Sequence, residues 1–181
     1  DQRIVYESHI SISPDTSHGY AMVQYFNNTF IVPYIARNAP TVTKRHARSD
    51  GARAQYKGCH HFGYISSYSH DHSATCKINW SWFCSCHGKC FCDPEGGTCK
   101  NAAAANEKRE EHGQTLASSF DFYAFCKGNL MRPDKSLIEK RGKGIFRRFF
   151  YFIPGAGEGA VNYKIQKWGG VEGSNSMHQM R

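Results

Sequence analysis

Acidic residues are scarce in this chain, and long hydrophobic runs are missing from it. Asp and Glu number 15 against 23 Lys and Arg, which leaves a formal net charge of +8. No run approaches the roughly 18 apolar residues that a membrane-spanning helix needs. A positively charged start followed by an apolar stretch, the mark of a secretory signal peptide, is also missing. We therefore expect an intracellular, nuclear protein with no membrane partner and with nucleic acid as its partner, DNA being favoured over RNA.

Paired C-x-x-C motifs are absent, although the chain has eight cysteines. Five cysteines fall between positions 84 and 99, where the pattern is C-x-C-H-x-x-C-x-C. Zinc prefers four thiolate or imidazole ligands in tetrahedral geometry, which C-x-C pairs satisfy less well. We expect reduced, partly buried thiols; the alternative is a zinc site formed by Cys84, Cys86, Cys90 and Cys92. Nearby histidines could join such a site, but we expect them to be solvated: His60, His61, His70 and His72.

The hydrophobic pattern indicates a mixed α/β fold with a real core. Hydrophobic residues make up 40% of the chain and aromatic residues 14%, enough to oppose disorder. Patterns typical of strands occupy residues 3–13, 41–48, 76–83, 144–153 and 160–168. Patterns typical of helices occupy residues 22–30, 52–69, 98–111 and 115–126. We expect the first helix to end before Pro33, and residues 87–100 to begin as a polar turn.

Acidic side chains follow two of the predicted strands. Asp50 comes directly after one, and Asp93 and Glu95 follow the other. Carboxylates at neighbouring strand ends can bind Mg²⁺ or Mn²⁺, and two such ions can activate phosphodiester cleavage. Between them, His87 could orient a scissile group or move a proton, and Lys89 could contact a phosphate. The simpler alternative is that Asp50 forms an ordinary Asp-Gly turn and Asp93 caps the next helix.

A basic and aromatic segment follows near the C-terminal end. Its cations are Arg141, Lys143, Arg147 and Arg148, and its rings are Phe146, Phe149, Phe150 and Tyr151. Charge interleaved with stacking surfaces suits a nucleic-acid strand. The alternative is an amphipathic strand whose rings enter the core while its basic residues face water.

Several motifs resemble those of a group of eukaryotic transposase-like proteins. Ser49-Asp50-Gly51 with Gln55-Tyr56-Lys57 resembles the motif S-D-G-x-x-x-Q-[FY]-K. A second signature is similar to residues 80–102, through Trp80 to Phe83, His87-Gly88-Lys89, Asp93, Gly96-Gly97 and Lys100-Asn101-Ala102. Asp15 and His18, and the closing residues 173–179, are similar to weaker motifs of the group. The chain departs from the pattern at Cys90, where the group has glycine, and at the Asp93-Pro94-Glu95-Gly96 turn.

The resemblance implies a ribonuclease-H-like fold and descent from a DNA transposase with an acidic triad. It implies a partial core over residues 1–128 and a basic aromatic extension over residues 129–181. The first acid of the triad would lie before Asp1, so we expect a piece of a longer protein that is inactive as this chain alone. The implied catalytic residues are Asp50, Asp93, Glu95 and His87, with Asp50 and Asp93 as metal ligands. The implied nucleic-acid contacts are Lys57, Lys89, Lys100, Arg147 and Arg148. The alternatives are a non-enzymatic nucleic-acid-binding or assembly subunit and a zinc-stabilised binding module.

Overall fold

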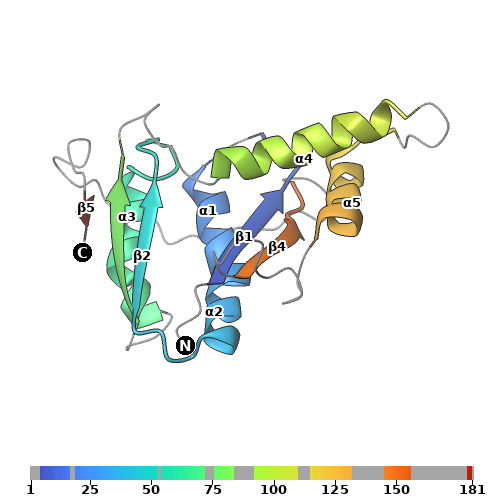
Figure 1. The fold of residues 1–181 in the computed structure, drawn as a ribbon. Helices are drawn as coiled ribbons and strands as arrows, with labels where there is room; N and C mark the ends of the chain where they lie inside the picture. Colours follow the sequence, from blue (N-terminus) through green and yellow to red (C-terminus); the bar gives the residue numbers. More distant parts are fainter. Residues whose placement is uncertain are drawn as a thin grey trace. The chain divides into compact units, whose positions relative to one another are not determined.

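The computed structural model describes residues 5–16, 19–52, 54–71, 76–83, 92–109, 115–131, 145–155 and 179–180. Helices and short, largely parallel sheets share this part of the chain (Figure 1). The elements run in the order β1 (Val5–Ile12), α1 (Tyr20–Phe26), η1 (Asn27–Ile31), α2 (Val32–Asn38), β2 (Lys44–Ser49), α3 (Cys59–Asp71), β3 (Lys77–Trp82), α4 (Cys92–Glu107), α5 (Ser119–Leu130), β4 (Ile145–Phe152) and β5 (Gln179–Met180). The predicted α/β class is confirmed. The predicted strand over residues 160–168 lies outside the described residues.

The chain divides into two compact units. Unit 1 comprises Asp1–Thr16 and Lys89–Val161, and unit 2 comprises Ser17–Gly88 and Asn162–Arg181. Strand β4, which belongs to the segment we assigned to a C-terminal extension, pairs with β1 inside unit 1. The predicted boundary between residues 128 and 129 stays a prediction.

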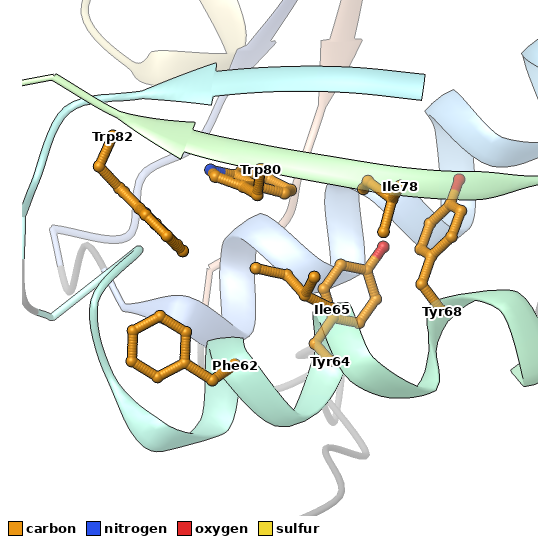
Figure 2. Close-up of a cluster of buried hydrophobic side chains, with 7 residues drawn as sticks. All are labelled: Phe62, Tyr64, Ile65, Tyr68, Ile78, Trp80 and Trp82. Atoms are coloured by element: carbon orange, nitrogen blue, oxygen red, sulfur yellow. The ribbon is translucent and has the colours of Figure 1, made fainter. Parts of the chain in front are cut away.

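Unit 2 is built on a three-stranded sheet in the order β2-β3-β5. Strands β2 and β3 are parallel, and α3 connects them along the chain and packs on one face of the pair (Figure 1). Alternate residues of β3 are buried, so that Ile78, Trp80 and Trp82 share one face as the period-two pattern predicts. Figure 2 shows these three side chains meeting Phe62, Tyr64, Ile65 and Tyr68 of α3. The aromatic rings meet edge to face, as Phe62 and Trp82 do at 5.3 Å between ring centroids, which is a favoured arrangement for such pairs.

The helical segment before β2 is longer than predicted. It continues through Pro33 to Asn38, so the prediction that the helix ends before Pro33 is wrong. Pro33 stands in the first turn of α2, where a missing N–H costs little. The π-helical turn η1 directly precedes α2, so the regular α-helical hydrogen-bond pattern is already interrupted before the proline.

Unit 1 joins β1 and β4 as a parallel pair covered by helices α4 and α5. Its core consists of Ile12, Cys99, Ala103, Phe125, Cys126 and Phe150. Helix α4 begins at Cys92, so the predicted turn over residues 92–97 is wrong. Asp93 and Glu95 in its first turn favour helix formation there because acidic side chains interact well with a helix N-terminus. No described helix is both long and apolar enough to cross a membrane.

Strand β4 mixes basic and aromatic side chains on both of its faces. Arg148 and Phe150 are both buried, whereas Arg147, Phe149 and Tyr151 alternate with them. The alternative of rings inside and cations outside is therefore wrong for this strand. The reason is that a carboxylate lies within reach of each arginine, as described below.

Candidate functional site

The C-terminal ends of β2 and β3 are joined by hydrogen bonds around Ser49. The indole N–H of Trp80 donates to the Ser49 hydroxyl at 2.9 Å, and the backbone N–H of Phe83 donates to the Ser49 carbonyl at 3.1 Å. Ser49 is buried, and Asp50, the next residue, is exposed. The two parallel strands thus hold the Asp50 turn at their carboxyl edge, where open α/β sheets commonly bind ligands.

The turn itself brings Lys57 close to Gly51. An Asp50 carboxylate oxygen accepts a hydrogen bond from the Ala52 N–H at 3.2 Å, and the Ala52 carbonyl then accepts from the N–H groups of residues 55, 56 and 57. A β-carbon added at Gly51 would lie 3.5 Å from the Lys57 ammonium nitrogen and 3.5 Å from the Phe83 carbonyl oxygen. These are ordinary van der Waals distances, so they place the lysine side chain over the turn without requiring glycine at this position.

This arrangement can serve phosphate chemistry. Asp50 offers oxygen ligands, and Lys57 offers a compact cation of the kind that binds phosphate as a point charge. The sequence motif predicts both residues, and the structure places them in one turn. Among the described residues no group of three or more His, Cys, Asp or Glu side chains could hold a metal ion.

The second acidic pair lies on α4 in unit 1. Asp93 is exposed in the first turn of the helix. Glu95 instead accepts two hydrogen bonds from the Arg148 guanidinium, at 2.7 and 3.1 Å, in a fork-like ion pair. Arg148 is only 7% exposed, so Glu95 balances a buried charge. Asp50 lies in unit 2, and the convergence of Asp50 with Asp93 stays a prediction.

The other predicted site residues are exposed, paired with an acid, or outside the described residues. Lys100 is exposed on α4. Arg147 donates to Glu7 across the strand pair at 3.1 Å, and its Nε has no hydrogen-bond partner in the described part of the chain. His87 and Lys89 lie outside the described residues, as do Cys84, Cys86 and Cys90. Cys92 is exposed at the start of α4.

Two thiols in unit 1 are buried side by side. Cys99 of α4 and Cys126 of α5 are both in the core, and they interact with each other. Burial raises the pKa of Cys126 to about 12 and also raises that of Cys99. Both thiols stay protonated at neutral pH, and the choice between reduced thiols and a zinc site at Cys84, Cys86, Cys90 and Cys92 stays a prediction.

His61 of α3 is a residue that sequence reasoning misplaced. We expected a solvated side chain, but it has 0% exposure and lies edge to face against Trp80 at 4.4 Å between ring centroids. Neither ring nitrogen has a hydrogen-bond partner among the described residues. Burial lowers its pKa to about 4, so the ring is neutral at pH 7. The apolar run that follows, Phe62 to Ile65, is the signal that could have placed His61 in the core.

A polar chain on the β1–β4 sheet was also missed. The Nδ1 atom of His9 lies 2.9 Å from the Tyr151 hydroxyl, and its Nε2 atom lies 3.4 Å from the Glu7 carboxylate. Burial lowers the pKa of His9 more than the neighbouring Glu7 raises it. No local pattern could reveal this cluster, because Tyr151 is 142 residues from His9.

Residues 1–141 match a known family, a domain of unknown function, DUF8701. The chain belongs to this family. The match covers β1 to α5 and ends before β4. The comparison with curated proteins gives no significant match, and neither does the comparison with solved structures.

Proposed function

We propose that this chain is a nucleic-acid-binding domain derived from a DNA transposase, and that it acts in the nucleus. The observation that carries the proposal is the exposed Asp50 turn with Lys57 over it, held at the carboxyl edge of two parallel strands. The β2-α3-β3 order and the net charge of +8 support it. The proposed fold is ribonuclease-H-like, with β2 and β3 as two of its parallel strands.

In this proposal Lys57 contacts a backbone phosphate. An ammonium group near a phosphate displaces a condensed counterion, so binding weakens as salt rises. Three backbone hydrogen bonds to the Ala52 carbonyl fix the backbone of the turn from which Lys57 projects, and this reduces the backbone entropy lost on contact. Lys100 on α4 is a further candidate for a phosphate contact, since its side chain is exposed.

Fluorescence anisotropy with a labelled DNA duplex over a salt series tests the binding. We expect a steep linear fall of log K with log salt concentration, and Lys57→Gln should make the slope shallower by about 0.9. Lys108→Gln, an exposed lysine after α4, is the matched control and should leave the slope nearly unchanged. A flat salt response of the unmodified chain would reject nucleic-acid binding.

The ancestral chemistry is tested separately. We propose that strand cleavage needs Asp50, Asp93 and an acid supplied from outside this chain, with Mg²⁺ or Mn²⁺. We therefore expect no nicking of supercoiled plasmid by this chain at any Mg²⁺ or Mn²⁺ concentration. Nicking that disappears in Asp50→Asn but persists in Thr41→Ala, a change at an exposed residue outside the proposed site, would show instead that the chain is an active nuclease.

A further inference from the structure

The face of the β2–β3 pair opposite α3 carries only polar side chains. On this face the register places Lys44 beside Lys77, His46 beside Asn79, and Arg48 beside Ser81. The alternate residues Ala47, Ile78, Trp80 and Trp82 face the aromatic core instead. We call the six residues Lys44, His46, Arg48, Lys77, Asn79 and Ser81 the basic face.

The cations of the basic face are exposed, and no carboxylate of the described residues neutralises them. Lys44, Arg48 and Lys77 are exposed, and none of their side chains forms a hydrogen bond or ion pair with another described residue. Neither strand contains an acidic residue. Arg45 shows the contrast, because it points to the other side and donates to Asn27 at 2.6 Å and to Tyr68 at 3.3 Å.

We propose that the basic face binds the phosphate backbone of duplex DNA without reading its sequence. This inference rests on the proposed function and names its main contact surface. Lys44 and Arg48 are four residues apart along a strand, about 13 Å, so the two cations can contact different phosphates of the same duplex. The register partner Lys77 widens the charged row across the sheet.

The composition of the basic face favours nucleic acid over other anionic partners. It contains no aromatic or aliphatic side chain, whereas protein interfaces depend on such anchors and interfacial membrane binding needs an apolar surface. Asn79 and Ser81 can donate hydrogen bonds to phosphate oxygens, as such residues commonly do in DNA complexes. A sheet lying flat on the backbone makes phosphate contacts and few base contacts, so we expect little sequence preference.

Two triple variants of equal charge test the inference in the full chain. The face variant carries Lys44→Gln, Arg48→Gln and Lys77→Gln. The control variant carries Lys108→Gln, Arg109→Gln and Lys127→Gln, three exposed positions in unit 1. Each lowers the net charge of +8 by three, so a difference between them reports position rather than total charge.

We measure duplex affinity by fluorescence anisotropy between 50 and 300 mM salt, after checking both variants by circular dichroism. The face variant should reduce the salt slope by about 2.7 and weaken binding at least about tenfold at 0.1 M salt, while the control changes the slope little. If the face variant does not fold, the single variants Lys44→Gln, Arg48→Gln and Lys77→Gln replace it, each reducing the slope by about 0.9.

The other outcomes separate the two proposals. No binding by the unmodified chain rejects the proposed function and this inference together. Equal losses in both triple variants mean that net charge alone drives binding, which overturns the inference but not the proposed function. If the face variant binds duplex DNA as tightly as the unmodified chain, the inference is also overturned. If the face variant keeps its binding to DNA but no longer binds phosphatidylserine vesicles, the basic face is a membrane-binding surface and the inference is overturned.

Discussion

Each unit buries one basic side chain among its described residues, and the two units stabilise it differently. In unit 1 the buried Arg148 keeps its charge and is paired with Glu95 through two hydrogen bonds. In unit 2 the buried His61 has no partner among the described residues and becomes neutral. Arginine cannot release its proton in a protein, so burial requires a carboxylate, whereas histidine can lose its charge at small cost. The type of buried base therefore decides whether a core needs an ion pair.

The largest loss of stability is expected from a substitution in the ion pair of unit 1. Glu95→Gln keeps the shape of the side chain but removes the carboxylate charge that accepts two hydrogen bonds from the buried Arg148. We expect the free energy of unfolding to fall by about 3–5 kcal/mol. Urea denaturation followed by far-UV circular dichroism measures this loss.

The controls for Glu95 separate charge from position. Asp93→Asn, an exposed acid in the same helical turn, should cost only about 0.3–1 kcal/mol through the helix dipole. The double variant Glu95→Leu with Arg148→Met should recover most of the stability, because it removes both charges together. A loss below about 1 kcal/mol for Glu95→Gln would mean that the pair behaves like one on the surface.

His61 makes unit 2 sensitive to pH in a direction that can be derived. Its pKa is about 4 when folded and 6.5 when unfolded, so the unfolded chain binds the extra proton between these values. Stability is therefore complete above pH 6.5 and is lost as the pH falls toward 4. At 1.36 kcal/mol per pH unit the full loss is about 3 kcal/mol.

The variant His61→Phe isolates this effect. It fills the same site with a ring that does not titrate, and the remaining acids and histidines contribute equally to both proteins. We expect the stability difference between the two proteins to grow as the pH falls from 6.5 to 4. Urea midpoints from the fluorescence of Trp80 and Trp82, both in unit 2, provide the measurement. If the free energy of unfolding falls equally in the two proteins as the pH falls, His61 takes up a proton as readily in the folded chain as in the unfolded chain.

Sequence reasoning predicted elements whose signal is local, and it failed where partners are distant. The period-two pattern of Ile78, Trp80 and Trp82 predicts strand β3 and its buried face, and both are confirmed. The pairing of Glu95 with Arg148 spans 53 residues, and no local pattern indicates it. His60 and His61 are neighbours in the sequence, but His60 is half-buried and His61 is fully buried, because α3 packs His61 against Trp80.

In the candidate site, too, the features with a local sequence signal were predicted and those with distant partners were not. The Asp50 turn with Lys57 was predicted from a compact motif, and the structure brings those residues together within one turn. The start of α4 was not predicted, because Pro94, Gly96 and Gly97 are typical of a turn. The acidic first turn of this helix and the Arg148 anchor on Glu95 together stabilise helix where composition favours a loop.

Ser49 extends the comparison to buried polar groups that carry no charge. Its hydroxyl accepts the indole N–H of Trp80, whereas the indole nitrogen of Trp82 has no partner among the described residues. Ser49→Ala would leave the Trp80 donor buried and unpaired, which should cost about 1–3 kcal/mol. Tryptophan fluorescence in urea measures the loss. Ser81→Ala, on the opposite face of β3, should change stability by less than about 0.5 kcal/mol, and an equal loss in both variants would rule out the hydrogen bond as the cause.

In unit 1, the N-terminal cap of α5 is stabilised by local hydrogen bonds of a serine. The Ser118 hydroxyl accepts the Asp121 N–H at 3.1 Å, and the Asp121 carboxylate accepts the Ser118 N–H at 3.0 Å, which forms a capping box. Ser118→Ala should lower the free energy of unfolding by about 1 kcal/mol, because the orphaned N–H group is exposed and can bind water. Thermal denaturation followed by circular dichroism measures it. Ser118→Asn should retain most of the stability, and if both variants lose the same amount, the serine contributes by something other than capping.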